Sequence, residues 1–211
     1  MLLNRANLAV VEAASKEDSR YTLKGILCDQ EGTTATDGHI LCHVTPPPGM
    51  TAEGFPVVVG TERPTEPIKP FILPLESAKE VAKALPKKTT IPILKTAMVC
   101  RASNDNGKAY ISVTDLETSR LFSPDKVSSQ FPDWHRVTPK DEDAKFTIGL
   151  DGALLERVVA VARALKAEAG DKRDAIALTF RFTDAQSAVK VTATNSEGQS
   201  LTAVIMPMRI E

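Results

Sequence analysis

The chain has 211 residues, 42% of them hydrophobic and 25% charged, a composition typical of a globular protein with one large domain or two small ones. Its formal net charge is −1. Because proteins that neutralise phosphates are usually basic, the chain either does not bind DNA or confines its positive charge to one surface. No apolar run reaches the roughly 20 residues that span a bilayer, and three widely spaced cysteines argue against a disulfide framework or a zinc site.

Three segments carry apolar residues at helical spacing, near residues 4–15, 74–85 and 150–166. In the second segment Pro74 is expected at an early helical position. Its predicted apolar face comprises Ala78, Val81, Ala82 and Leu85. The third segment is predicted to bury Leu154, Val158, Val161 and Leu165. Proline-containing stretches at 46–50 and 61–70 predict long connections between the first two segments.

Each predicted helix precedes strand-like runs that end in a similar hairpin. The hairpin sequences are ATDGHILCHV, VTDLETSRLF and ATNSEGQSLTAV. Their Thr-Asp or Thr-Asn pairs begin at Thr36, Thr114 and Thr194, which are 78 and 80 residues apart. Asp and Asn suit such turns because their side chains bond nearby backbone groups, and Gly38 and Gly198 can take positive φ.

The order helix, strands, hairpin therefore occurs three times. It predicts an α+β fold of three half-units, each with one helix and three or four antiparallel strands. Unrelated α+β proteins also contain strand-turn-strand segments with Asp in the turn, so the pattern alone leaves open whether the half-units are true repeats.

Three motifs give the repeat a family resemblance. The segment ATDGHIL at residues 35–41 resembles a hairpin motif of the bacterial DNA sliding clamp, the beta subunit of DNA polymerase III. FPDWHRVTPK at 131–140 resembles the segment that ends that family's middle domain, and IMPMRIE at 205–211 resembles its C-terminal sequence. The motifs follow the family's order, so the chain resembles a shortened bacterial sliding clamp.

The resemblance implies the DNA clamp fold in a reduced form. Residues 1–140 correspond to the family's middle domain, with half-units at about 1–68 and 69–140, and residues 141–211 correspond to the last half of its third domain. The implied function is that of a DNA sliding clamp, a polymerase processivity factor that encircles duplex DNA and is not itself an enzyme.

In this family the cleft between the middle and last domains binds short hydrophobic peptides from polymerases, clamp loaders and repair factors. The resemblance implies that the matching positions here bind peptide: Thr36, Gly38, His39, Leu41, Pro74, Ala78, Val204, Met206, Pro207, Met208 and Arg209. Two positions depart from the family, because Ile40 replaces an arginine of the charged rim and Ala78 is smaller than the usual branched residue. Ordinary core packing is the alternative role for each residue taken singly.

Clamp rings line their channel with helices that carry Lys and Arg, which implies a DNA-facing side on this chain. The candidates are Arg5, Lys79, Lys83, Lys87, Arg157, Arg163 and Lys166. Mobile cations near the phosphates suffice for non-specific attraction, and locked contacts would impede sliding. The alternative is a solvated helix face, which the neighbouring Glu76, Glu80 and Glu156 would suit equally well.

Catalysis is disfavoured by the motifs. Asp37, His39 and His43 lie close in sequence and His135 follows Asp133, but the chain contains no HExxH, paired-cysteine, glycine-loop or nucleophile-elbow motif. No cofactor and no metal are therefore expected. The cysteine usage and the missing signal-peptide pattern favour a reducing cytoplasm, of a bacterium or of a phage-infected host.

The half-unit count also predicts an assembly. Rings of this family contain twelve half-units, so three per chain imply a homo-oligomeric ring of four chains. Neighbouring half-units are related by approximate twofold axes, so the contacts would join like ends of the chains, with dihedral symmetry. The rival hypothesis is a clamp-fold adaptor or decoy that binds clamp-interaction peptides without encircling DNA, and the oligomeric state separates the two.

Overall fold

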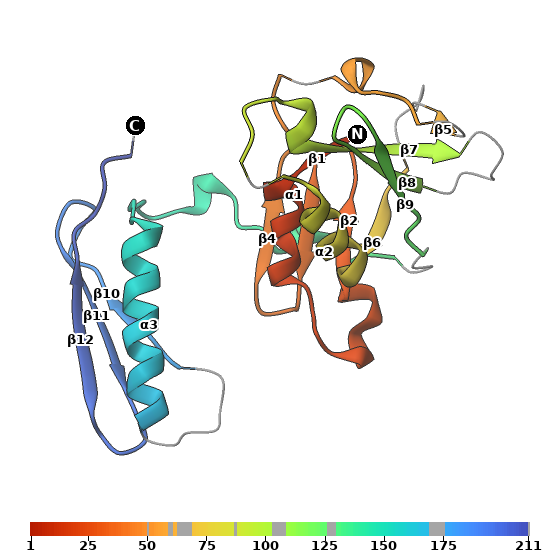
Figure 1. Cartoon of the computed structure of the whole chain (residues 1–211). Helices are drawn as coiled ribbons and strands as arrows, with labels where there is room; N and C mark the ends of the chain where they lie inside the picture. The colour runs from red at the N-terminus through yellow and green to blue at the C-terminus, as the bar shows by residue number, and fades with distance from the viewer. Residues whose placement is uncertain are drawn as a thin grey trace. The chain divides into compact units, whose positions relative to one another are not determined.

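The computed structural model describes residues 1–49, 51–58, 61–62, 69–86, 88–102, 109–125, 130–168 and 176–210. It is an α+β protein whose chain divides into two compact units, an N-terminal unit of residues 1–137 and a C-terminal unit of residues 138–211 (Figure 1). Within the described ranges no helix is both long and apolar enough to cross a membrane.

The N-terminal unit contains two helices and nine strands among its described residues. Its elements are β1 (Leu2–Asn4), α1 (Arg5–Ala9), β2 (Gly25–Cys28), β3 (Thr33–Thr36), β4 (Leu41–Val44), β5 (Thr61–Glu62), β6 (Phe71–Pro74), α2 (Leu75–Ala84), β7 (Thr96–Ala102), β8 (Ala109–Thr114) and β9 (Ser119–Phe122). Short 3-10 turns lie at Val10–Ala13, Asp18–Leu23, Ala52–Gly54, Ile93–Lys95 and Trp134–Val137.

These strands form two antiparallel sheets that interleave the two half-units. One sheet has the order β4-β3-β2-β6, and the other has the order β1-β7-β8-β9 with β5 also on β7. The strand before each helix thus joins the sheet of the other half-unit, because β1 pairs with β7 and β6 pairs with β2. Helices α1 and α2 contact each other (Figure 1), and the core between helices and sheets includes Leu3, Leu8, Leu73 and Val81, each fully buried.

Both helices of this unit differ from the predicted segments at their ends. Asn4 caps α1 through reciprocal bonds with Asn7, and the predicted helix continues past Ala9 only as a 3-10 turn. Pro74 is the last residue of β6 and the N-cap of α2, not a helical residue, because its ψ of 148° is extended. The predicted apolar face of α2 is confirmed, with Ala78, Val81 and Leu85 buried and Ala82 half-buried.

The C-terminal unit contains one helix and one small sheet among its described residues. It comprises a 3-10 turn at Asp141–Asp143, α3 (Gly152–Glu168), β10 (Thr179–Arg181), β11 (Val189–Thr194) and β12 (Ser200–Ile205). The sheet order is β10-β11-β12, with antiparallel pairing throughout, and α3 lies over one face of it (Figure 1). Alternate residues Val189, Val191 and Ile205 point into the core between sheet and helix, as the period of a strand requires.

The buried face of α3 is rotated relative to the predicted one. Leu154, Val158 and Leu165 are partly buried as expected, but Val161 is 53% exposed. Ala162 is fully buried and Lys166 is only 8% exposed. The prediction chose Val161 because it is apolar, whereas the sheet covers the face on which the smaller Ala162 permits close approach.

The three hairpins have related turns, of which the third is one residue longer than the others. In each turn the side-chain oxygen of Asp37, Asp115 or Asn195 accepts backbone N–H groups at 2.6–3.1 Å. Gly38 and Gly198 have positive φ, and Leu116 takes that conformation in the second turn, where no glycine is available. The predicted fold class of three helix-plus-strands half-units is therefore confirmed.

Candidate peptide-binding and DNA-facing surfaces

The first hairpin holds its predicted peptide-binding residues at the end of the first sheet. Thr36 pairs with Leu41, and its hydroxyl donates to the Ile40 carbonyl at 2.7 Å and accepts the Gly38 N–H at 3.1 Å. His39 is exposed, and so is Ile40, by 51% of its surface. The turn therefore presents an imidazole and a branched apolar side chain from a fixed backbone.

The carboxylate of Asp37 fixes the backbone of this turn. It accepts the N–H groups of Ile40 and His39 at 2.9 and 2.7 Å, and these two bonds hold the pKa of Asp37 below its usual range. Asp37 is therefore ionised at neutral pH and used for structure. The corresponding bonds from Thr118 lower the pKa of Asp115 in the second hairpin in the same way.

Positive charge remains at this hairpin although Ile40 replaces the arginine of the family motif. The Arg20 guanidinium donates to the Asp37 carbonyl at 2.6 Å, and its other side pairs with Glu17 at 3.1 Å. Arg20 thus supplies a guanidinium at this hairpin, partly neutralised by Glu17. Sequence reasoning missed Arg20 because it lies 17 residues before the motif, in a 3-10 turn that only the fold brings to the hairpin.

Pro74 lies on β6, on the other side of β2 from the hairpin strand β3. Pro74 pairs with Gly25 of β2, and β2 pairs with β3 at Leu27 and Thr34. A Cβ on Gly25 would come within 2.5 Å of the Leu73 carbonyl oxygen, so only glycine allows β6 to approach here. Gly25 was not singled out in the sequence, since no turn or motif surrounds it.

Ala78 does not belong to an accessible surface. Its side chain is fully buried in the core beneath α2, together with Val81 and Leu75. The assignment of Ala78 to peptide binding is therefore corrected: its small size reflects the close packing of α2 on the sheets.

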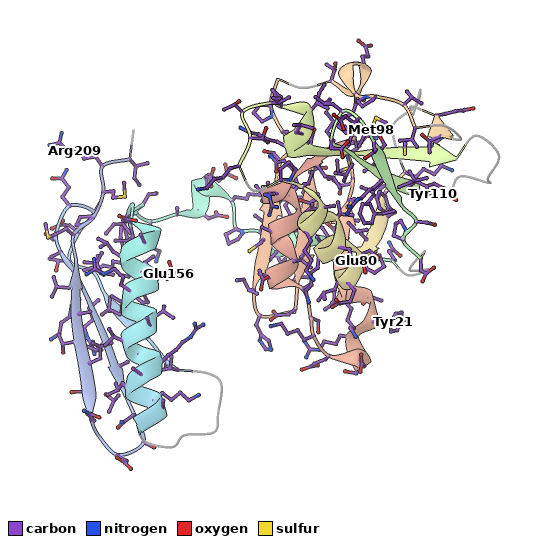
Figure 2. The ribbon with its side chains drawn as sticks, viewed as in Figure 1. Tyr21, Glu80, Met98, Tyr110, Glu156 and Arg209 are labelled. Carbon is purple, nitrogen blue, oxygen red and sulfur yellow. The ribbon has the colours of Figure 1, made fainter. Side chains whose placement is uncertain are left out.

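The C-terminal segment presents a row of exposed apolar side chains. Val204, Met206, Met208 and Ile210 are 55–65% exposed, while Ile205 between them is buried. The backbone of the segment is held by a bond from Met208 N–H to the Gly149 carbonyl at 2.9 Å. Pro207, Met208 and Arg209 line one side of an open groove of about 570 Å³ whose other side includes Thr147 and Gln186, and Figure 2 shows Arg209 near the end of the chain. Exposed methionines adapt to ligands of different shape.

The predicted DNA-facing residues of the N-terminal unit have different environments. Lys83 is exposed, and Lys79 is partly exposed with an ion pair to Glu76 at 3.1 Å. Arg5 instead donates to the carbonyl groups of Leu85 and Pro86 at the end of α2, so its main contact is structural. Lys87 lies outside the described residues.

On α3, Arg157 and Arg163 are exposed, whereas Lys166 is only 8% exposed, which corrects its assignment to the DNA-facing side. Glu156 on α3 and Glu80 on α2 are exposed as well (Figure 2), so each helix offers mixed charge. A cation that the sequence did not single out is Arg120, which lines a groove of about 610 Å³ together with Arg5 and Lys83.

Two of the histidines considered for catalysis, His43 and His135, form contacts within the fold. The ring of His43 bonds the Thr34 hydroxyl at 2.9 Å and stacks on Trp134, with ring centroids 4.4 Å apart. His135 bonds the Glu31 carboxylate at 2.8 Å, which raises the pKa of the imidazole. In the part of the chain that the structure describes, no three His, Cys, Asp or Glu side chains gather in a way that could hold a metal ion.

Comparison with known proteins assigns this architecture to one class. The solved structures that resemble it include the beta sliding clamp of Caulobacter crescentus (TM-score 0.61, 18% identity), a clamp of Pseudomonas aeruginosa bound to griselimycin (0.57, 20%) and the clamp of Bacillus subtilis (0.60, 15%). Each similarity covers 98–100% of this chain and 49–50% of the other. The protein has the DNA clamp fold.

The comparison of sequences finds relatives among the same proteins. The chain is 25% identical over 199 residues to the beta sliding clamp of Escherichia coli strain K12, a match that covers 90% of this chain and 43% of the relative. No family model matches the chain. The chain resembles the bacterial beta sliding clamp in a shortened form and spans less than half the length of the curated relatives it matches.

Proposed function

We propose that the protein is the subunit of a DNA sliding clamp, a processivity factor that encircles duplex DNA as a homo-oligomer. The observation that carries the proposal is the repeated half-unit, with exchanged strands in the N-terminal unit, in a chain that matches sliding clamps over almost its whole length. The relatives are named as sliding clamps of DNA polymerase. The proposed role is mechanical and non-catalytic, in the cytoplasm, and needs no cofactor.

DNA would be held through mobile cations on the helices. Lys79, Lys83, Arg157 and Arg163 are accessible on α2 and α3, and acidic neighbours limit how strongly they attract phosphate. Such weak, non-specific attraction suits a protein that slides, because firm phosphate contacts would fix its position. The near-neutral net charge is compatible with this arrangement.

Polymerase and clamp-loader peptides would bind the first hairpin and the C-terminal segment. The support lies in each unit separately: His39, Ile40 and Leu41 with the Arg20 guanidinium in one, and Val204, Met206 and Met208 in the other. A short linear motif with apolar anchors and an acidic group would match these side chains.

The assembly is proposed to be a ring of four chains, with like ends in contact. Three half-units per chain and twelve per ring, the number that the resemblance implies, give this count. An adaptor that binds clamp-interaction peptides without encircling DNA is the second candidate, and the mixed charge of α2 and α3 is the observation that favours it.

A loader-free trapping experiment tests encirclement. The protein is added to linear duplex DNA carrying biotin at both ends, either before or after streptavidin blocks the ends, and the DNA is then washed with high salt. A ring that threads on is retained only when added first. The variant Lys79→Glu/Lys83→Glu/Arg163→Glu should load less and show a weaker salt dependence, by about one unit of slope for each phosphate that is no longer neutralised.

The result separates the two candidates. Release in both orders of addition, while a clamp-binding peptide still binds, would support the adaptor and rule out the ring. Light scattering after gel filtration gives the number of chains independently, and a monomer at micromolar concentration would contradict any ring.

A further inference from the structure

The N-terminal unit is completed by an exchange of strands between its two half-units. Strand β1 precedes α1 and pairs with β7 of the second half-unit, and β6 precedes α2 and pairs with β2 of the first. The segment before each helix therefore covers one edge of a strand in the other half-unit: β1 covers β7, and β6 covers β2.

The third half-unit contains both parts of this exchange. Asp151 caps α3, as Asn4 caps α1, through a bond from the Ala153 N–H at 2.8 Å, so residues 148–151 correspond to the exchanged strands. Strand β10 corresponds to β2 and β7, since Thr179 pairs with Thr192 as Leu27 pairs with Thr34 and Met98 with Ser112. Among the described residues, however, no strand pairs with the outer edge of β10.

The burial of matching positions differs accordingly. The leucine before the helix cap is fully buried in the N-terminal unit, at Leu3 and Leu73, but its counterpart Leu150 is only half-buried. Ile26 and Ala97, which face those leucines across the ladder, are also fully buried. Their counterpart Leu178 is again half-buried. The strand exchange therefore buries these two positions in the N-terminal unit, whereas the matching positions of the C-terminal unit stay partly exposed.

We propose that a second copy of this chain supplies the missing strand, and that residues 148–151 of each copy pair with residues 177–180 of the other. The register carried over from the N-terminal unit sets Leu150 opposite Leu178 and Gly149 opposite Thr179. This contact details the homo-oligomer of the proposed function, but it does not rest on DNA or peptide binding.

The hydrogen bonds already formed by the donor segment agree with this register. In β1 the Met1 carbonyl accepts the Val99 N–H at 2.9 Å, so the backbone groups of Met1 and Leu3 face β7 and those of Leu2 face away. Gly149 is the counterpart of Leu2, and its carbonyl bonds Met208 N–H at 2.9 Å on the opposite edge. The N–H and carbonyl of Leu150 therefore face the edge on which the second copy would add.

A second copy is the occupant that the geometry favours because the half-unit is self-complementary. Among the described residues it has one open edge on β10, and its segment 148–151 is bonded along one edge only, so two copies related by a twofold axis would fill both open edges at once. Uncovered edge strands otherwise pair without control. Helix α3 packs on its own sheet and leaves Val161 53% exposed, whereas α1 and α2 of the N-terminal unit contact each other. The twofold would give α3 the same kind of neighbour.

A disulfide between copies tests the register. Thr147 and Arg181 are exposed, and in the proposed register they face each other one step beyond the ladder. They would form a non-hydrogen-bonded pair, in which the Cα atoms are typically about 4.5 Å apart, within disulfide range. We expect Thr147→Cys/Arg181→Cys, in a Cys42→Ser background, to form a chain dimer on a non-reducing gel, with a 147–181 link identified by mass spectrometry. The matched control Lys145→Cys/Arg181→Cys, shifted by two residues, should crosslink far less.

A backbone change provides the second test. Leu178→Pro removes an N–H that the exchange needs and that β11 does not use, so the mass measured by light scattering should fall by half. Leu178→Ala trims the same side chain, keeps the N–H and should retain the full mass. Equal crosslinking of both cysteine pairs, or an unchanged mass for a Leu178→Pro variant with native circular dichroism, would overturn the exchange. Both measurements omit DNA, so they fail independently of the sliding function.

Discussion

At the scale of single residues, the polar side chains at the turns act mainly on the backbone. Asp37, Asp115 and Asn195 occupy the same position in three hairpins and bond the same kind of N–H groups. Asn195 also donates to the Leu165 carbonyl at 3.0 Å, which fastens the third hairpin to α3. Short acceptor side chains at these positions therefore set the hairpins from which the candidate surfaces extend.

The contact between His135 and Glu31 predicts a pH-dependent contribution to stability. Because the Glu31 bond raises the folded-state pKa of His135 above its ordinary value of 6.5, the stabilisation is fully present below that value and is lost as pH rises through the folded pKa. Both side chains are more than half exposed, so the effect is small. Denaturant unfolding of His135→Gln and the native chain should differ at about pH 6 and converge by about pH 9. A difference independent of pH would contradict this role.

Lys166 provides a test of side-chain packing on α3. The residue is only 8% exposed, so its methylene stem packs within the C-terminal unit. Lys166→Ala should therefore lower the free energy of unfolding by about 1 kcal/mol, whereas Lys166→Met keeps most of the stem and should stay within about 0.5 kcal/mol of the native chain. Arg163→Ala on the exposed side of α3 is the control and should also stay within about 0.5 kcal/mol. Equal stability of the Lys166→Ala variant and the native chain in denaturant unfolding would contradict this packing role.

At the scale of elements, apolar periodicity predicted where the helices lie more accurately than which of their faces are buried. The face of α2 follows from Ala78, Val81 and Leu85, because strong alternation with Lys and Glu leaves one apolar side. Helix α3 is rich in Ala and Val on several sides, so spacing alone admits more than one face. In the structure the buried face includes Ala162 and leaves Val161 exposed.

Substitution of two methionines in the C-terminal segment should weaken peptide binding and leave the fold intact. Met206→Ser/Met208→Ser removes two exposed apolar side chains but keeps the backbone bond from Met208 to Gly149. Calorimetry with a polymerase-derived clamp-binding peptide should show an affinity lower by about tenfold or more. Deletion of residues 206–211 should abolish binding.

A matched substitution controls for general loss of apolar surface. Ile91→Ala removes a side chain that is 44% exposed outside both candidate surfaces, and it should leave peptide affinity unchanged. An affinity for the serine double variant equal to that of the native chain would show that the peptide surface lies elsewhere.

At the scale of the whole molecule, the first two half-units exchange strands with each other, and the third has no partner for such an exchange among the described residues. The N-terminal unit buries the segments before both helices, while in the C-terminal unit the corresponding segment bonds only the chain's own tail, among the described residues. An odd number of half-units thus leaves a self-complementary edge, and this edge connects the fold of one chain to the proposed assembly.

The sequence by itself determined the fold class and the three hairpins, because these follow from local residue chemistry: Asp or Asn at a turn, and apolar spacing on a helix or strand. Its three motifs carry the family resemblance. Only the tertiary structure decided that Arg20 lies at the first hairpin, that Ala78 and Lys166 are buried, and that β1 and β6 exchange sheets. Each of these depends on contacts between residues distant in sequence, whose geometry local patterns do not encode.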